Sequence, residues 1–380
     1  MAIDFFKKAE LNTTFVEKSI TFKNQLFMSK VHNFSAGPCI LPQEVLKQAS
    51  EAVINFNNLN LSLIEISHRS KDFDVIIKRA QSLVRELLNV PEGYSILFLQ
   101  GGASLQFSMV PMNFLPEGGK AAYLDTGVWS DKAIKEAKLF GNPVVVASSK
   151  DKNYNYIPKG FDVPEDASYF HVTTNNTIYG TEIFEDYDCK IPLIADMSSD
   201  IFSRKIDVSK YDLIFAGAQK NMGPAGATLV IIKDDLLEKK ARVVPTMLDY
   251  KTHVDKDSMF NTPPTFAIYV SMLNLEWLKA QGGVEAIEKQ NIAKADLLYK
   301  TIEAHPLFTP NVGKESRSRM NVTFTAVDET VKQRFLTACQ ENGIAAIKGH
   351  RLAGGFRASL YNALPLSSVE ILTEVMNSIR

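Results

Sequence analysis

Short apolar runs alternate with longer amphipathic segments from Val31 to about residue 280. Seven of the apolar runs have strand length and little polar alternation, which is typical of strands that are covered on both faces. The segments between them repeat their apolar positions with helical spacing. Predicted strands span residues 95–99, 121–124, 144–147, 169–173, 193–195, 213–216 and 228–232, and predicted helices span 43–55, 73–88, 104–112, 130–139, 267–280 and 284–304. This alternation predicts an α/β fold.

The run Gln281-Gly282-Gly283 separates two long helical patterns, and apolar strands become sparse after it. We therefore expect a domain boundary there. The remaining chain predicts a strand at 320–324, a helix at 331–343 that ends in glycine, and a strand at 356–359. These elements indicate a smaller α+β domain.

Composition is that of a globular protein with a large core: 380 residues, 45% hydrophobic and 22% charged. The formal net charge of -1 offers no global attraction to nucleic acid or to an anionic membrane. We find no run of about 20 apolar residues and no secretory signal pattern, so the expected location is cytoplasmic. The three cysteines are far apart and lack CxxC spacing, which predicts neither disulfides nor a metal site. Residues 1–30 contain no arginine and are interpreted as an N-terminal extension.

A turn of small residues, Gly101-Gly102-Ala103-Ser104, joins a predicted strand to a helix. Unpaired amides at such a helix start form a cradle for an anion such as phosphate. A tight turn without a ligand explains the same residues equally well. The spacing also departs from the GxGxxG fingerprint, which disfavours a dinucleotide site.

Asp196 follows the apolar strand 193–195, and Lys220 follows the strand 213–216. A carboxylate at a buried strand end needs a cationic partner, although an Asx turn or helix cap is a common alternative. A lysine between a buried strand and the turn Gly223-Pro224-Ala225-Gly226 can be desolvated and nucleophilic. Together, amine, carboxylate and anion cradle match the needs of pyridoxal phosphate, whose ring Trp129 could cover. Core packing is the alternative for Trp129.

From His32 onward the chain resembles the phosphoserine aminotransferases, which are fold-type-I pyridoxal-phosphate enzymes. The resemblance rests on six strings in the same order over nearly 350 residues. They are HNFSAGP at 32–38, SHRS at 67–70, GGASLQF at 101–107, AQKN at 218–221, MFNTPPT at 259–265 and GHR at 349–351. The resemblance implies that residues 43–283 form a large domain that binds the cofactor. Its sheet would have seven mostly parallel strands covered by helices. Residues 31–42 and 284–380 would form the small α+β domain.

The resemblance also assigns roles to individual residues. Lys220 would bind the cofactor as a Schiff base and move the substrate proton, and Asp196 would keep the pyridine nitrogen protonated. Asn261 and Thr262 would reach the cofactor phosphate from the second subunit of a homodimer, so that two chains share each active site. The remaining cofactor contacts would be Ala103, Ser104, Trp129, Thr177 and Gln219.

Substrate binding would rely on cations, because arginine binds carboxylates and phosphates through two parallel hydrogen bonds. By resemblance, Arg357 would hold the α-carboxylate. The distal anion would be held by His68, Arg69, His350 and Arg351, which could otherwise form surface salt bridges. Some members of the family carry arginine where this chain has Ser104, so one contact to the distal anion must be absent or replaced.

The resemblance implies reversible amino transfer between L-glutamate and 3-phosphohydroxypyruvate, which gives 2-oxoglutarate and O-phospho-L-serine in serine biosynthesis. Alternatives are a related phosphorylated substrate in vitamin B6 (pyridoxine) synthesis, or another fold-type-I enzyme such as a cysteine desulfurase. A cofactor-free binding protein would not need Lys220, Asp196 and Trp129 together. A dehydrogenase is disfavoured by the spacing of the glycine turn.

Overall fold

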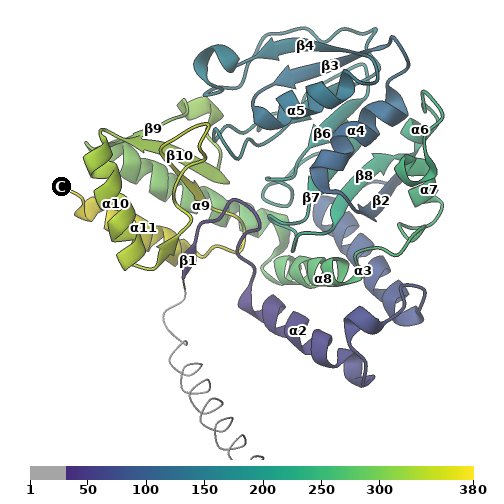
Figure 1. Ribbon diagram of the computed structural model, residues 1–380, viewed down its shortest axis with the longest axis horizontal. Helices are drawn as coiled ribbons and strands as arrows, with labels where there is room; N and C mark the ends of the chain where they lie inside the picture. The colour runs from purple at the N-terminus through teal and green to yellow at the C-terminus, as the bar shows by residue number, and fades with distance from the viewer. Residues whose placement is uncertain (1–30) are drawn as a thin grey trace, which may run out of the picture.

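A computed structural model describes residues 31–380 (Figure 1), so the predicted extension at 1–30 lies outside the described part. Its centre is a seven-stranded sheet with the order β2-β8-β7-β6-β5-β3-β4. Strand β8 runs antiparallel to both neighbours, β2 and β7, and every other neighbouring pair is parallel. The strands are β2 Tyr94–Leu99, β3 Lys120–Asp125, β4 Asn142–Ser148, β5 Phe170–Thr173, β6 Leu193–Asp196, β7 Leu213–Gly217 and β8 Thr228–Lys233. All seven predicted strands are present, and the predicted α/β class is confirmed.

Helices cover both faces of this sheet (Figure 1). In β7, alternate side chains point to opposite faces of the sheet. Ile214 and Ala216 belong to the apolar core on one face, and Leu213 and Phe215 belong to the core on the other. The first side is filled by α3 Lys71–Leu88 and α8 Thr265–Ala280, and the second by α4 Gly102–Phe114 and α5 Val128–Ala137. Because side chains alternate across a strand, continuous apolar strands require this double covering.

Helix α3 shows how a local signal moves an element boundary. It begins two residues before the predicted start, because the hydroxyl of Ser70 accepts a hydrogen bond from the amide of Phe73 at 3.3 Å. Asp72 and Asp74 lie in the first turn, where the helix dipole favours negative charge. The helix ends at Asn89, whose left-handed backbone, with φ of 49°, stops the helical pattern.

A second apolar core consists mainly of residues from the C-terminal part, among them Phe324, Phe335 and Phe356, and also contains Phe34 from the start of the described chain. Its antiparallel sheet has the order β12-β10-β9, and the two-residue strand β1 pairs in parallel with β11. The elements are β1 His32–Asn33, α9 Gly283–Ala304, β9 Phe308–Pro310, β10 Asn321–Ala326, α10 Glu329–Glu341, β11 Ile344–Ala345, β12 Phe356–Ser359 and α11 Leu366–Ser378. This core supports our proposal that 31–42 and 284–380 form one small domain, separate from 43–283.

The turn between α8 and α9 lies at the proposed boundary. Gly282 has a φ of 95°, and a Cβ added there would lie 2.9 Å from that of Ala286. Only glycine adopts this conformation without strain. Several elements were not predicted. They are the short strands β1, β9 and β11, the helix α11, and the small helices α6 Asp234–Leu237 and α7 Tyr250–Val254. The predicted helix 43–55 is present as α2 Gln43–Ile54.

Candidate active site

Asp196 and Lys220 lie at one edge of the large sheet. Asp196 ends β6, Lys220 lies three residues beyond the end of β7, and these neighbouring strands are parallel. The carboxyl ends of parallel strands meet at the same edge, which is where open α/β sheets bind ligands. The structure therefore brings the predicted carboxylate and amine together.

The Lys220 amine is tuned for nucleophilic chemistry. Burial lowers the pKa of Lys220 to about 8, although the carboxylates of Asp196 and Asp200 oppose this shift. Burial likewise raises the pKa of the Asp196 carboxyl, while hydrogen bonds from Ser198 and the charge of Lys220 act in the opposite direction. A lysine with a pKa near neutrality holds a useful fraction of free amine.

The peptide of Lys220 is held by the segment at the start of the described chain. The thiol of Cys39 donates to the Lys220 carbonyl at 2.8 Å, and the Cys39 amide donates to the Gln219 carbonyl at 3.1 Å. Gly37 has a φ of 139°, and a Cβ there would lie 3.4 Å from Cγ of Lys220. Residues about 180 positions apart thus fix the backbone of the reactive lysine.

Trp129, Thr177 and Arg357 form a connected group beside the amine. Nζ of Lys220 lies 5.9 Å from the ring centroid of Trp129, whose Nε1 donates to the hydroxyl of Thr177 at 2.9 Å. Nη1 of Arg357 donates to the Thr177 carbonyl at 3.1 Å, while its buried Nε has no partner among the described residues. Arg357 comes from β12, so the second core contributes to the same site.

The glycine turn before α4 has the geometry of an anion cradle. Gly101 has a φ of 88°, and a Cβ there would lie 2.5 Å from a methyl carbon of Leu105. Helix α4 begins at Gly102, so Ala103 and Ser104 lie in its first turn, where amides lack partners within the helix. Across the turn, Nε2 of Gln100 donates to the Thr262 carbonyl at 2.9 Å.

These groups fit pyridoxal phosphate. The Asp196 carboxylate is buried, and its Oδ1 accepts the Ser198 amide at 2.9 Å. A buried carboxylate at the edge of the sheet suits a protonated ring nitrogen. The Trp129 ring, the Lys220 amine and the amides at the start of α4 supply the other contacts that the cofactor needs.

The distal-anion residues divide into two sets. His350 lies close enough to Arg357 and Arg351 that their charges lower its pKa, after the larger effect of partial burial. His68 and Arg69 follow the short helix η2 Leu63–Glu65, and no described contact joins them to Lys220 or Asp196. Nε2 of His68 is buried without a partner among the described residues. One chain thus gathers His350, Arg351 and Arg357, but not His68 and Arg69.

Known proteins resemble this chain over nearly all of its described length. The family model described as Aminotransferase class-V matches residues 31–372. The phosphoserine aminotransferase of Flavobacterium johnsoniae is 57% identical over 351 residues, covering 92% of this chain and 99% of that protein. That of Bacteroides thetaiotaomicron is 56% identical, covering 91% and 98%. The chain belongs to the phosphoserine aminotransferase family.

Solved structures of the family show the same fold. The phosphoserine aminotransferase from Bacillus circulans subsp. alkalophilus has a TM-score of 0.90 at 43% identity, covering 92% of this chain and 98% of that one. The pyridoxal-phosphate-bound phosphoserine aminotransferase from Trichomonas vaginalis has a TM-score of 0.88 at 40% identity, covering 92% and 100%. The predicted resemblance and fold type are confirmed.

Two groups of charged side chains near the candidate active site were not predicted from the sequence. A buried ion-pair cluster includes Asp200, whose carboxyl interacts electrostatically with Asp196: Arg204 is 3.5 Å from Asp200 and 3.7 Å from Glu182. The spacing of four residues between Asp196, Asp200 and Arg204 was the available signal. Lys132 is the second group, with Nζ 4.6 Å from the Trp129 ring centroid. Both residues lie in α5, where a spacing of three places them on one face, whereas the predicted helix began at 130 and left Trp129 out.

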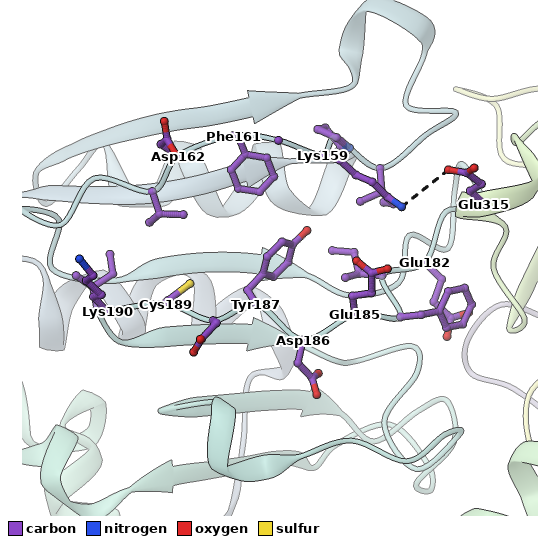
Figure 2. A pocket seen from close by; sticks show the side chains of 18 of the residues that line it. Lys159, Phe161, Asp162, Glu182, Glu185, Asp186, Tyr187, Cys189, Lys190 and Glu315 are labelled. Atoms are coloured by element: carbon purple, nitrogen blue, oxygen red, sulfur yellow. Dashed lines mark ion pairs between the residues drawn. The ribbon is translucent and has the colours of Figure 1, made fainter.

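A separate cavity of about 530 Å³ lies between the segments 157–165 and 182–191. Figure 2 shows its acidic side chains and Lys159, which points toward Glu315. Its charged groups are mostly exposed, and Lys159 and Lys190 are paired with Glu315 and Glu165. None of the predicted site residues lines this cavity.

Proposed function

We infer that this protein is a pyridoxal-phosphate-dependent transaminase that moves an amino group reversibly between L-glutamate and 3-phosphohydroxypyruvate. The products are 2-oxoglutarate and O-phospho-L-serine, and the reaction belongs to serine biosynthesis. The observation that carries this function is the buried Lys220 amine, which lies 5.9 Å from the Trp129 ring and acts electrostatically on Asp196. The family membership of the whole described chain supports it.

We propose the following roles for the site residues. When bound, pyridoxal phosphate supplies an aldehyde that takes up the amino group and a ring that withdraws electrons from the substrate Cα. Asp196 would hold the proton of the ring nitrogen, and Lys220 would take the proton from the substrate Cα. The cofactor would be anchored by Ala103, Ser104, Trp129, Thr177 and Gln219, with Asn261 and Thr262 from a second subunit.

The two ends of the substrate would bind to different positively charged side chains. Arg357 would bind the α-carboxylate, because its unpartnered Nε is free for a second hydrogen bond beside the one that Nη1 makes to Thr177. His350 and Arg351 would bind the distal phosphate or carboxylate, together with His68 and Arg69.

A desulfurase is disfavoured by the state of the cysteines. Burial raises the pKa of Cys39 to about 12, and its thiol is engaged by the Lys220 carbonyl. Burial also raises the pKa of Cys189, and that of Cys339 to about 12. A cysteine that attacks sulfur must instead form a thiolate readily.

The test is a titration of the purified holoenzyme followed by the visible absorption band of the bound cofactor. We expect O-phospho-L-serine and L-glutamate to discharge the band at micromolar to millimolar concentration, and L-alanine and L-cysteine to do so far less effectively. A band that L-alanine or L-cysteine discharges best would refute the substrate. A protein that takes up no cofactor would refute the enzyme. Activity toward related phosphorylated substrates of vitamin B6 synthesis can be compared in the same assay.

We further propose that two copies form a homodimer with shared sites, in the cytoplasm. Support comes from an exposed apolar face on α2 and the following segment, because monomers rarely expose so many large apolar side chains together. Its members are Leu46, Val53, Ile54, Leu59, Leu61 and Ile64. His68 and Arg69 follow this face in the chain, so a second copy docked there would contact the segment that carries them. None of the helices within 31–380 has the length and apolar character that a bilayer crossing requires.

Hybrid dimers test the sharing of sites. Lys220→Ala removes the amine, and Thr262→Glu places a negative charge toward the cofactor phosphate, so each variant alone should be inactive. If Lys220 and Thr262 of one site come from different chains, each hybrid dimer regains one intact site. Co-expression should then restore about a quarter of wild-type activity, as expected for random pairing of symmetric dimers. Activity that stays at the level of the separate variants would exclude a shared site.

A further inference from the structure

Lys132 is a cation at the active site that no role above employs. It lies on α5, and its Nζ is 4.6 Å from the ring centroid of Trp129, the same ring that Nζ of Lys220 approaches at 5.9 Å. It forms no ion pair with any residue in 31–380. One turn later on the same helix, Lys135 is paired with Asp131 at 2.6 Å. The contact with the Trp129 ring face therefore positions the Lys132 ammonium without neutralising it.

Lys132 belongs to a group of cations contributed by two parts of the fold. The pKa of His350 is lowered first by partial burial and then by the positive charges of Arg357, Arg351 and Lys132. Arg351, Arg357 and Lys132 have no carboxylate within ion-pair distance among the described residues. Geometry links Lys132 to Arg357 as well: Lys132 lies over the Trp129 ring, Trp129 donates to the Thr177 hydroxyl, and Arg357 donates to the Thr177 carbonyl. Positive charges gathered in this way repel one another, so an anion bound beside them relieves the repulsion.

Helix α5 brings Lys132 to this region from the large-sheet half, and the segment after β7 brings Lys220, the lysine assigned to the cofactor. The neighbouring helix α4 presents Ser104 in its first turn, and serine carries no charge. Arg351 and Arg357 both come from the C-terminal part, and Arg357 is tied to Thr177 through Nη1. Among the cations that one chain gathers here, Lys132 is therefore a large-domain group to which no cofactor role has been assigned.

We propose that Lys132 is a substrate-binding residue that contacts the distal anion, phosphate in particular, together with His350 and Arg351. The proposal rests on the transaminase function above and specifies how its substrate is selected. Lysine acts as a compact point charge on a flexible stem, so it reaches both phosphate and a carboxylate. It should favour phosphate, because that group carries more charge at neutral pH. A substrate without a distal anion gains nothing from Lys132.

The test compares holoenzymes of the wild type and Lys132→Met in single-turnover reactions, followed by loss of the cofactor absorption band. For O-phospho-L-serine we expect the half-saturating concentration to rise about 10- to 100-fold, as for loss of one charged hydrogen bond. For L-glutamate the rise should be smaller. The maximal rates should change less than about threefold, because a contact made equally before and during reaction affects binding alone. With L-alanine, kcat/KM should be unchanged.

Two further variants make the result specific. Lys135→Met removes a lysine from the same helix and should leave all three amino acids unaffected. Lys132→Arg keeps the charge and should restore most of the preference for phosphoserine. An equal loss with L-alanine would show that Lys132 only supports the Trp129 ring, and an unchanged response to phosphoserine would also overturn the proposal. A wild type that binds the cofactor but ignores phosphoserine would instead refute the transaminase function itself.

Discussion

The edge of the large sheet and the cavity in Figure 2 are both lined by charged residues, but the charges are arranged differently. In the cavity, the exposed amine of Lys190 is paired with Glu165 at 2.6 Å. At the sheet edge, Lys220 is buried, and Arg351, Arg357 and Lys132 have no carboxylate partner among the described residues. Paired exposed charges are already satisfied by each other and by water. The lesson is that a buried amine beside a buried carboxylate at the ends of neighbouring strands, and not the size of a hollow, marks the reactive region.

The largest expected effect is a difference in turnover between a substitution of Lys220 at the sheet edge and one of Lys190 at the cavity. Lys220→Ala should lower turnover by more than about 1,000-fold, since both the attachment of the cofactor and the proton transfer at the substrate Cα are lost. The measurement is the steady-state rate of phosphoserine formation with cofactor in excess.

Lys190→Ala is the matched control, because it removes a lysine from the rim of the cavity. Its turnover should equal that of the wild type, and its stability should change by less than about 1 kcal/mol, as for an exposed ion pair. If Lys220→Ala kept near wild-type turnover, or if Lys190→Ala lost it, the contrast between the two regions would be wrong.

A smaller effect concerns the pH dependence of cofactor uptake. Only the unprotonated amine attacks an aldehyde, and burial lowers the pKa of Lys220 to about 8. The rate at which apoenzyme takes up pyridoxal phosphate should therefore rise about tenfold per pH unit below pH 8 and level off above it. An exposed lysine would show a rise that continues to about pH 10.

Asp196→Asn sharpens this prediction. The Asp196 carboxylate raises the pKa of Lys220, so its neutralisation should move the plateau to lower pH. Stopped-flow absorbance on the apoenzymes gives both profiles. A plateau at the same or higher pH in the variant would show that Asp196 does not act on the amine.

Most strands of the large sheet could be predicted because each is a continuous apolar run that both helical layers bury. The edge strand β4 is only partly buried, but its apolar run at 144–147 still indicates a strand. Lys220 and Asp196 could be predicted because the reactive side chain directly follows such a run. Helix α11 was missed although its buried positions Val369, Leu372 and Met376 follow helical spacing. The strands β1 and β11 have two residues each and are defined by their pairing, so no local pattern indicates them.

Other parts of the site depend on contacts between distant segments. The group of Lys132, His350 and Arg357 joins α5 to the region around β12, and nothing in the local sequence of either predicts that meeting. The hydrogen bond from the Cys39 thiol to the Lys220 carbonyl likewise joins two segments that are far apart in the sequence, so no local pattern predicts it. The roles of His68, Arg69, Asn261 and Thr262 concern a second chain and stay predictions.

Pairing between β1 and β11 has a consequence for the order of folding during synthesis. His32 aligns with Ile344, so about 310 residues must be made before this strand has a partner. At the usual speed of translation the wait is roughly 15 to 60 s. During that time Phe34, fully buried in the finished protein, has no core to enter. The nascent chain therefore carries an exposed apolar segment that a chaperone can bind until the last hundred residues leave the ribosome.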